Sequence, residues 1–388
     1  MPPSSLPLSA GAFALRGKDV LQGIALLVCL LAWTMPASAE GRIVIKDIAG
    51  REVVLERPAR RIILAQGRHL PALSLIHPNP VSIMAGWQSD MRRQDAATYA
   101  AFQRKFPALG DVPIVGDGSP GGLSVERVLS LQPDVVIASF YVIGGNGGSA
   151  DQNLVLQRLE SAGIPVVFVD FFANPLRNTA ESISILGKVT GRDKEAGAFR
   201  RFYEDHIANL TTTIAAHQPN RPTVFMHAHA GGRDCCYSSG KGTFDDFITL
   251  AGGRNIAAGI IPGSTGQISL EYLLKANPDV YVATGGAHMA SSGGLVLGSG
   301  VTPAQAHTKF AEILARPGFS SLSAVTSGHA HALWQMFNDS PAHIVALEWL
   351  AKWSQPDLFK DLDPNETMQR LNGFSAVPLE GTFWIDHP

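Results

Sequence analysis

Residues 123–138 read LSVERVLSLQPDVVIA, and residues 268–283 read ISLEYLLKANPDVYVA. The two segments match at seven of sixteen positions and begin 145 residues apart. In each, a serine suited to cap a helix precedes an acidic residue, apolar residues follow at helical spacing, and a proline precedes a short apolar strand. The repeat therefore predicts two α/β lobes of the same design, since a solenoid needs closely spaced repeats.

The rest of the chain continues this alternation of strands and helices. Short apolar runs that come after turn residues predict buried strands, and longer amphipathic stretches predict helices. Outside the repeat, we expect strands at residues 61–65, 80–85, 165–169 and 223–228, and helices at residues 69–75 and 153–162.

A long helix is expected between the two lobes. Residues 193–216 lack proline and place apolar residues near helical spacing, so a helix of about 24 residues would be about 36 Å long. The predicted fold class is α/β: two Rossmann-like lobes with central sheets, joined by one long connecting helix. The predicted domains are a signal peptide at 1–39, an amino-terminal lobe at 40–190, the connecting helix at 191–217 and a carboxy-terminal lobe at 218–388.

The first 39 residues have the pattern of a cleaved signal peptide. Arg16 and Lys18 precede an apolar run at residues 24–33, and Ala37-Ser38-Ala39 gives a small-residue cleavage site. Ten apolar residues are too few to cross a bilayer, which needs about 20. Cys29 follows Val28, whereas a lipidation site calls for a small residue there. We therefore expect export to the periplasm and cleavage after Ala39.

Composition narrows the possible functions. The chain has 388 residues, is 45% hydrophobic and carries a formal net charge of −2. Without a basic surplus it is not expected to bind nucleic acid. Of the 3 cysteines, Cys235 and Cys236 are adjacent and lie outside the leader. In an oxidising compartment they predict either a disulfide between neighbours or two separate thiols.

No motif assembles a catalytic site. The segment at residues 116–121 matches G-x-G-x-x-G, but it contains a proline and no acidic residue follows the next strand, so a turn is the better interpretation. We expect no enzyme and no cofactor. His227 and His229 lie at the end of a predicted strand, where residues two apart share a face. With a third ligand they would hold a metal; otherwise they are strand or cleft histidines.

Five landmarks, by their order and spacing, resemble those of one known family. They are the opening segment at residues 45–63, the first repeat helix, the segment GTFDDFITLAGGRNIA at 242–257, the second repeat helix and the late turn at 319–328. The chain resembles the periplasmic substrate-binding proteins for iron-siderophores, haem and cobalamin, which feed ABC importers. The resemblance covers residues 43–362.

The resemblance implies how such a protein works. It implies a monomer that holds its ligand between two lobes, hinges little and delivers the ligand to an inner-membrane ABC permease. By position in the repeat helices, Glu126 and Glu271 would contact arginines of that permease. The alternative is that each glutamate only complements its helix dipole.

Ligand-contacting residues are expected beyond the carboxyl ends of the strands, as in other open α/β sheets. Arginines there suit an anionic, oxygen-rich chelate, and aromatic rings supply flat apolar walls. The expected ligand is a ferric siderophore; the alternatives are haem, with Tyr141, His227 or His288 on the iron, or cobalamin. A direct metal-ion binder and an exported enzyme are less favoured. The candidate residues are Arg68, His69, Trp87, Arg92, Tyr141, His227, His229, Arg233, Tyr237, His288 and Trp334.

Overall fold

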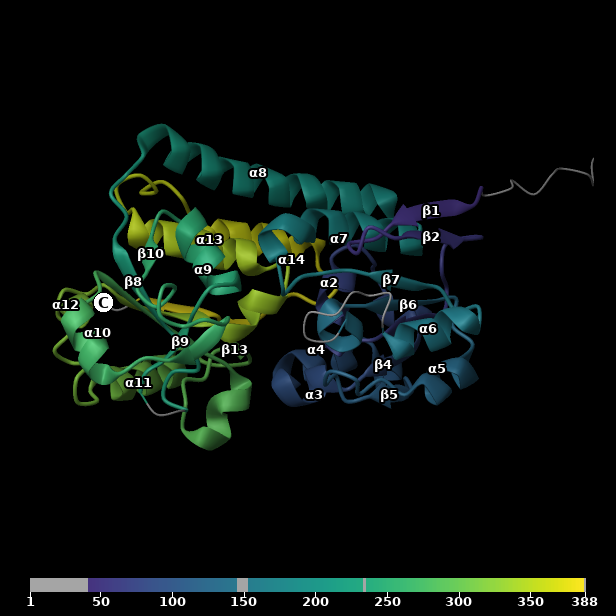
Figure 1. Ribbon diagram of the computed structural model, residues 1–388, viewed down its shortest axis with the longest axis horizontal. Coiled ribbons are helices and arrows are strands. Elements are labelled where there is room, and N and C mark those ends of the chain that lie inside the picture. The colour runs from purple at the N-terminus through teal and green to yellow at the C-terminus, as the bar shows by residue number, and fades with distance from the viewer. Residues whose placement is uncertain (1–40, 145–152, 233–234, 387–388) are drawn as a thin grey trace, which may run out of the picture. The chain divides into compact units, whose positions relative to one another are not determined.

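The structure is a computed structural model that describes residues 41–144, 153–232 and 235–386 (Figure 1). The predicted signal peptide, its cleavage site and the candidate ligand residue Arg233 lie outside the described residues.

The amino-terminal lobe is built on a parallel sheet of five strands in the order β5-β4-β3-β6-β7. The strands are short and almost entirely buried, as expected when helices cover both faces of a parallel sheet. An antiparallel pair, β1 (Ile43–Lys46) and β2 (Glu52–Leu55), precedes the sheet. The sheet strands are β3 (Ile62–Leu64), β4 (Met84–Gln88), β5 (Ile114–Gly116), β6 (Val135–Ala138) and β7 (Val166–Phe168). The helices are α2 (Leu70–Ser74), α3 (Asp90–Gln94), α4 (Ala96–Lys105), α5 (Val125–Leu131), α6 (Leu154–Ser161) and α7 (Pro175–Thr190).

The carboxy-terminal lobe has a mixed sheet in the order β11-β9-β8-β12-β14-β16, with β10 paired to β8. Strands β8, β10, β12 and β14 are parallel, and β9, β11 and β16 add antiparallel edges. The strands are β8 (Thr223–His227), β9 (Tyr237–Ser239), β10 (Arg254–Asn255), β11 (Thr265–Gln267), β12 (Val280–Gly285), β14 (Ala330–Trp334) and β16 (Trp384–Asp386). A small pair, β13 (Gly298–Ser299) and β15 (Gly381–Thr382), lies outside this sheet. The helices are α9 (Thr243–Leu250), α10 (Leu270–Ala276), α11 (Pro303–Leu314), α12 (Ser323–Thr326), α13 (His343–Ser354) and α14 (Pro364–Phe374).

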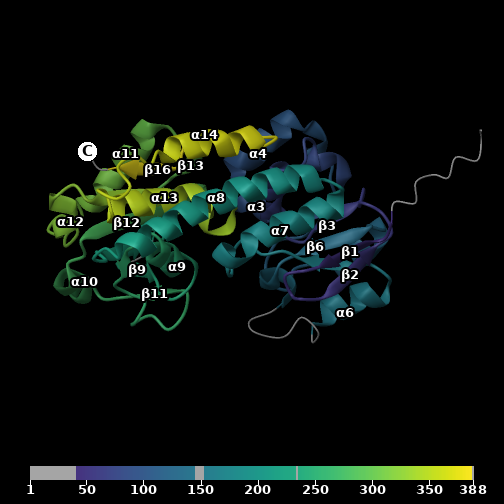
Figure 2. The same ribbon diagram turned by 90° about the horizontal axis from the view of Figure 1, so that it is seen from above.

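The long helix α8 (Asp193–His217) runs across both lobes (Figures 1 and 2). Asp193 lies in its first turn, where the helix dipole favours a negative charge, and the helix ends at Gln218 in the left-handed conformation. Phe199 and Phe202 are buried on its inner face, and their rings lie 5.4 and 5.3 Å from that of Phe374 in α14. The predicted fold class, with two α/β lobes and a long connecting helix, is confirmed.

The two copies of the repeat fold alike. Ser124 caps α5 by accepting a hydrogen bond from the Arg127 N–H at 3.3 Å, and Ser269 caps α10 in the same way through Tyr272 at 3.0 Å. Both helices end at a left-handed residue directly before the proline, Gln132 in one lobe and Asn277 in the other. The caps agree with the sequence prediction, whereas the left-handed ends were not predicted.

One predicted strand is displaced. Residues 80–85 were expected to form a strand, but Pro80–Ile83 is a 3-10 helix and the strand β4 begins only at Met84. Asn79 caps this turn by accepting a hydrogen bond from the Ser82 N–H at 3.3 Å, and Pro80 supplies a preset φ angle at its first position. The strand therefore runs on to Gln88.

Candidate functional site

The two lobes meet at the carboxyl ends of their parallel strands. Thr98 and Ser299 join their hydroxyl groups at 2.6 Å across this contact, and the Thr243 hydroxyl donates to the Phe172 carbonyl at 2.6 Å. The chain segments directly after β3, β6, β8, β12 and β14 lie at this edge, which is where open α/β sheets hold their ligands.

A buried charge cluster occupies the centre of the contact. Arg68 lies after β3 in the short 3-10 helix η1 (Gly67–His69), and its side chain is 13% exposed. Its Nε lies 3.1 Å from Oδ2 of Asp90 in the same lobe, and its Nη1 lies 2.5 Å from Oδ2 of Asp339 in the other lobe. The guanidinium charge is therefore matched by one carboxylate from each lobe.

Neutral hydrogen bonds extend this cluster. Gln66 donates from Nε2 to Asp339 Oδ2 at 2.9 Å and accepts from the Ser139 hydroxyl at 2.5 Å. These side chains are buried, and Asp339 is the last residue of the 3-10 helix η7 (Gln335–Asp339), which comes after β14. The ends of β3, β6 and β14 are thereby tied together across the lobes.

Burial and neighbouring charges shift the pKa values in this cluster. Burial raises the pKa of Asp339 to about 6; the Arg68 charge opposes this shift, while Asp90 and Asp170 add to it. Burial works against the charge of Arg68, but Asp339 and Asp90 together outweigh it, so the pKa of Arg68 is raised. Arg68 therefore stays charged and bound to its carboxylates.

Partly exposed rings lie next to the cluster. In the amino-terminal lobe Tyr141 is 42% exposed and lies edge-on to Phe172, with ring centres 5.9 Å apart. In the carboxy-terminal lobe His288 Nε2 lies 3.4 Å from His229 Nδ1, and the His229 ring is 6.0 Å from that of Tyr237. Burial, and then the positive charge of Arg68, lower the pKa of His288. These rings offer a ligand aromatic edges and, in His288, an imidazole whose pKa is lowered.

Three candidate residues lie in the core rather than at a ligand surface. Trp87 is fully buried in β4 and stacks on Tyr99. His227 is 2% exposed, bonds the Tyr281 hydroxyl through Nδ1 at 2.6 Å, and has its pKa lowered to about 3, mainly by burial. His69 is 1% exposed, and burial lowers its pKa to about 3 as well. Their burial argues against the predicted ligand contacts.

His227 and His229 do not form the predicted pair. Strand β8 ends at His227, and His229 has a φ of 51°, so the alternation that would place both rings on one face is broken. His227 stacks on Phe225 and Phe319, whereas His229 contacts His288. Among the residues that the structure describes, no group of three or more His, Cys, Asp or Glu side chains is placed to hold a metal ion.

Two further candidates take part in packing between and within the lobes. The Arg92 guanidinium lies over the Tyr99 ring, 4.9 Å from its centre, and 5.5 Å from that of Trp87. Trp334 is 5% exposed and borders a cavity of about 30 Å³ between the lobes. This cavity is far smaller than the roughly 300–1,000 Å³ of a ligand pocket, so Trp334 belongs to the packed part of the contact.

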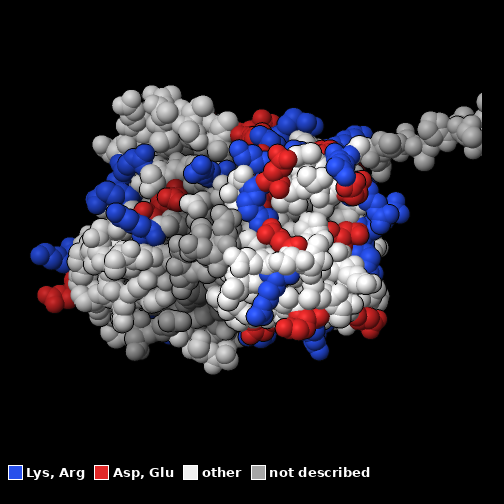
Figure 3. Space-filling model, turned by 45° about the vertical axis from the view of Figure 1, so that its right-hand side comes forward, with Lys and Arg blue, Asp and Glu red and all other residues white. Residues whose placement is uncertain are grey.

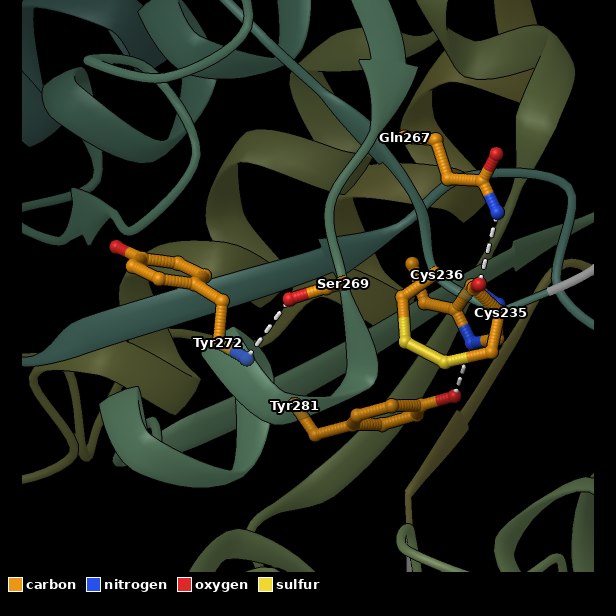
Figure 4. Close-up of a disulfide and its surroundings, with 7 residues drawn as sticks. Cys235, Cys236, Gln267, Ser269, Tyr272 and Tyr281 are labelled. Carbon is orange, nitrogen blue, oxygen red and sulfur yellow. Dashed lines mark hydrogen bonds between the residues drawn. A yellow bond between two sulfur atoms is a disulfide. The ribbon is translucent and has the colours of Figure 1, made fainter.

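Cys235 and Cys236 are joined by a disulfide between neighbours (Figure 4). Cys236 is buried, and its backbone N–H and carbonyl bond those of Ile268 at 3.1 and 3.0 Å. Gln267 donates to the Cys235 carbonyl at 2.9 Å. The disulfide segment is thus hydrogen-bonded to Gln267 and Ile268, directly before Ser269, the residue that caps α10.

Glu126 and Glu271 are exposed in the first turns of α5 and α10. They occupy equivalent positions in the two copies of the repeat. On the face shown in Figure 3, side chains of both signs are interspersed, in line with the near-neutral net charge.

Residues 84–333 match the family model described as periplasmic binding protein. The chain belongs to this family. A cobalamin-binding protein of Halobacterium salinarum is 30% identical over 207 residues, which cover 53% of this chain and 52% of that protein. A vitamin B12-binding protein of Yersinia pestis is 28% identical over 167 residues, covering 42% and 53%. The chain thus spans about half the length of these curated relatives.

Two solved structures extend the likeness in fold. A TroA-like periplasmic binding protein, FepB, from Veillonella parvula superposes with a TM-score of 0.82 at 22% identity, covering 89% of this chain and 100% of that one. A periplasmic heme binding protein from Pseudomonas aeruginosa gives a TM-score of 0.51 at 21% identity, covering 77% and 94%. At these identities the likeness shows the fold alone. Within the described residues, no helix has the length and apolarity needed to cross a membrane.

Sequence reasoning placed Arg68, Tyr141, His229, Tyr237 and His288 near one site but missed the two carboxylates that bind Arg68. Asp90 comes two residues after the end of β4. Ligand-contacting residues are expected just beyond strand ends, so Asp90 would have been a candidate if the end of β4 had been predicted correctly. Asp339 lies five residues after β14, in a turn that no sequence pattern singled out.

Proposed function

We propose that this periplasmic binding protein captures a corrinoid, of the cobalamin class, between its two lobes and delivers it to an ABC permease. It acts by binding alone, without catalysing a reaction, and it works after export to the periplasm. The names of the relatives in Halobacterium and Yersinia support this ligand class.

The observation that carries the proposal is the neutralised arginine at the centre of the site. Two carboxylates bind Arg68, and its side chain is 13% exposed, so it offers little to an anionic chelate. Ferric siderophores of high negative charge call for unpaired arginines, whereas a corrinoid presents a broad ring with amide edges. The exposed Tyr141 and the uncharged His288 suit such a ring. The siderophore therefore remains a prediction that the site favours less.

Haem is the second candidate ligand. Tyr141 is 42% exposed and His288 is half-buried, and each carries an atom that binds iron. A Soret shift on adding hemin, lost in Tyr141→Ala, would favour haem over a corrinoid.

Delivery rests on the paired glutamates. Glu126 and Glu271 lie at equivalent, exposed positions of two helices whose caps have the same geometry. We propose that both contact arginines of a permease with matching symmetry.

Equilibrium dialysis against a ligand panel tests the function. The purified chain is dialysed against cyanocobalamin, a ferric tris-catecholate and hemin, and bound ligand is read from its absorbance. We expect one cyanocobalamin per chain, and at least tenfold weaker binding in Tyr141→Ala, because the exposed ring is lost. Leu154→Ala, which truncates a side chain that is 68% exposed on α6, is the matched control and should bind like the parent. Tighter binding of the tris-catecholate than of cyanocobalamin would overturn the corrinoid proposal.

A further inference from the structure

The cluster around Arg68 holds more negative than positive charge. Asp90 and Asp339 both reach its guanidinium, at 3.1 and 2.5 Å, which leaves an excess of one negative charge when both are ionised. Asp170 acts on Asp339 from the segment after β7, and Asp95 borders the same small cavity from the start of α4. On the other side, the Arg68 charge reaches His288 and Tyr141, which are partly exposed. The charge of the buried cluster is therefore felt at these partly exposed rings, where we propose that the ligand binds.

The carboxylates of Asp90 and Asp339 have different structural roles. Asp90 shapes the backbone: its Oδ1 accepts from the Gly67 N–H at 2.7 Å, and its Oδ2 accepts from the Arg68 N–H at 3.3 Å. A Cβ on Gly67 would lie 2.2 Å from the Gln88 carbonyl oxygen and 2.8 Å from Asp90 Oδ1, so this close approach requires glycine. Asp90 is needed to build the turn that carries Arg68.

Asp339 makes no comparable backbone contact among the described residues. Its Oδ2 meets only the side chains of Arg68 and Gln66, both from the other lobe, and its Oδ1 makes no hydrogen bond with any described residue. A fully buried carboxylate with an unbonded oxygen is costly. Packing within the carboxy-terminal lobe does not explain why this buried carboxylate is present, whereas its ion pair with Arg68 does.

We infer that Asp339 is a specificity-determining residue: by holding Arg68 between the lobes, it excludes anionic chelates from the cleft and leaves the site to ligands of low net charge. This inference deepens the proposed function and rests on it. Without the Asp339 charge, Arg68 keeps one carboxylate partner, and the excess negative charge of the cluster disappears. A polyanion then meets a neutral Arg68–Asp90 pair instead of a cluster with an excess negative charge, so the repulsion is lost.

Acid should mimic the loss of this charge. The pKa of Asp339 is about 6, raised mainly by burial, so its carboxyl group is ionised at pH 7.5 and mostly protonated at pH 5. Affinity for a polyanion should therefore rise as the pH falls through 6. Asp90, Asp170, Asp95, His288 and Arg68 face the same group, so the comparison must be made against a variant that lacks only the Asp339 charge.

The test is the ratio of two affinities in Asp339→Asn, which keeps the size of the side chain and removes its charge. Dissociation constants for cyanocobalamin and for a ferric tris-catecholate, a trianion, are measured by equilibrium dialysis at pH 7.5. We expect the ratio to move about tenfold toward the trianion. Asp357→Asn, at an exposed position of the same lobe, is the matched control and should leave the ratio unchanged.

A second variant tests whether Arg68 carries the effect. In Asp339→Asn/Arg68→Gln the increased affinity for the trianion should vanish. In the parent chain, the affinity for the trianion should be higher at pH 5 than at pH 7.5. A folded Asp339→Asn whose ratio stays at the parent value would overturn the inference. If Asp339→Asn does not fold, a parent chain whose trianion affinity is the same at both pH values overturns it. Failure of the parent chain to bind cyanocobalamin would instead refute the proposed function.

Discussion

The amino-terminal lobe carries an all-parallel sheet and brings an arginine to the cleft, whereas the carboxy-terminal lobe adds antiparallel edges and brings a carboxylate and two histidines. Both lobes contain the same unit of capped helix, proline turn and buried strand. The shared part lies at exposed helix starts, and the different parts lie where the lobes meet. The repeat thus builds the scaffold and places two equivalent glutamates, the docking face that we propose, while the proposed recognition depends on the segments at the carboxyl ends of the strands.

The largest effect is expected when the equivalent glutamates of both lobes are replaced together. In Glu126→Ala/Glu271→Ala, uptake of ligand by cells should fall to background, because both contacts with the permease are lost. Ligand binding by the purified chain should stay at the parent level. Each single variant should retain partial uptake, to a similar degree in the two lobes. Parent-level uptake by the double variant would remove docking from the account.

The second-largest effect is expected when Asp90, whose carboxylate shapes the turn at Arg68, is removed. Asp90→Ala leaves two backbone N–H groups unbonded and removes one of the two carboxylate partners of the buried guanidinium, so it should lower the free energy of unfolding by about 3–5 kcal/mol. Urea unfolding followed by circular dichroism measures this loss. Asp357→Ala, at an exposed site, should stay within about 0.5 kcal/mol of the parent. Similar values for the two variants would mean that the Asp90 contacts contribute little.

Asp339, the carboxylate from the other lobe, should make the free energy of unfolding depend on pH. Because burial raises the pKa of Asp339 from 3.8 to about 6, folding is favoured by its protonated form. The stability it contributes is complete below pH 3.8 and is lost as the pH rises through 6, a difference of about 3 kcal/mol in all. Asp339→Asn should therefore lose less stability than the parent between pH 4 and pH 7, as measured by urea unfolding. Identical pH profiles would show that this carboxyl titrates normally.

The smallest expected effect compares the two helix caps. Ser124→Ala and Ser269→Ala each remove one hydrogen bond to a backbone N–H at the helix start, and each should cost about 1 kcal/mol of unfolding free energy. Thermal unfolding of both variants measures the pair side by side. A cost confined to one lobe would show that the two copies of the repeat are not equivalent units.

The sequence was sufficient for the scaffold because its signals are local. Helix caps, apolar periodicity and proline turns act within about a dozen residues, and they placed the repeat and the connecting helix. The position of Trp87 shows how a local error spreads. With a strand expected at residues 80–85, Trp87 was expected beyond its end; the Asn79-capped turn moves the strand to Met84–Gln88, so Trp87 belongs to the core.

The charge cluster was out of reach for a different reason. Arg68 and Asp339 are 271 residues apart, and their contact depends on how two lobes pack around a shared helix. An arginine directly after a strand indicated an anion site. Nothing in the neighbouring sequence reveals that Arg68 is already paired with Asp90 and Asp339. The same reasoning applies to the burial of His227, because its hydrogen-bond partner Tyr281 lies on a neighbouring strand.

Hydrogen exchange of the purified chain, with and without cyanocobalamin, tests most directly whether a corrinoid is captured between the lobes. We expect slower exchange in peptides from both lobes, one containing Tyr141 and one containing His288, with exchange around Glu126 and Glu271 unchanged. Slowed exchange in peptides of one lobe alone, or none at all under saturating ligand, would contradict it.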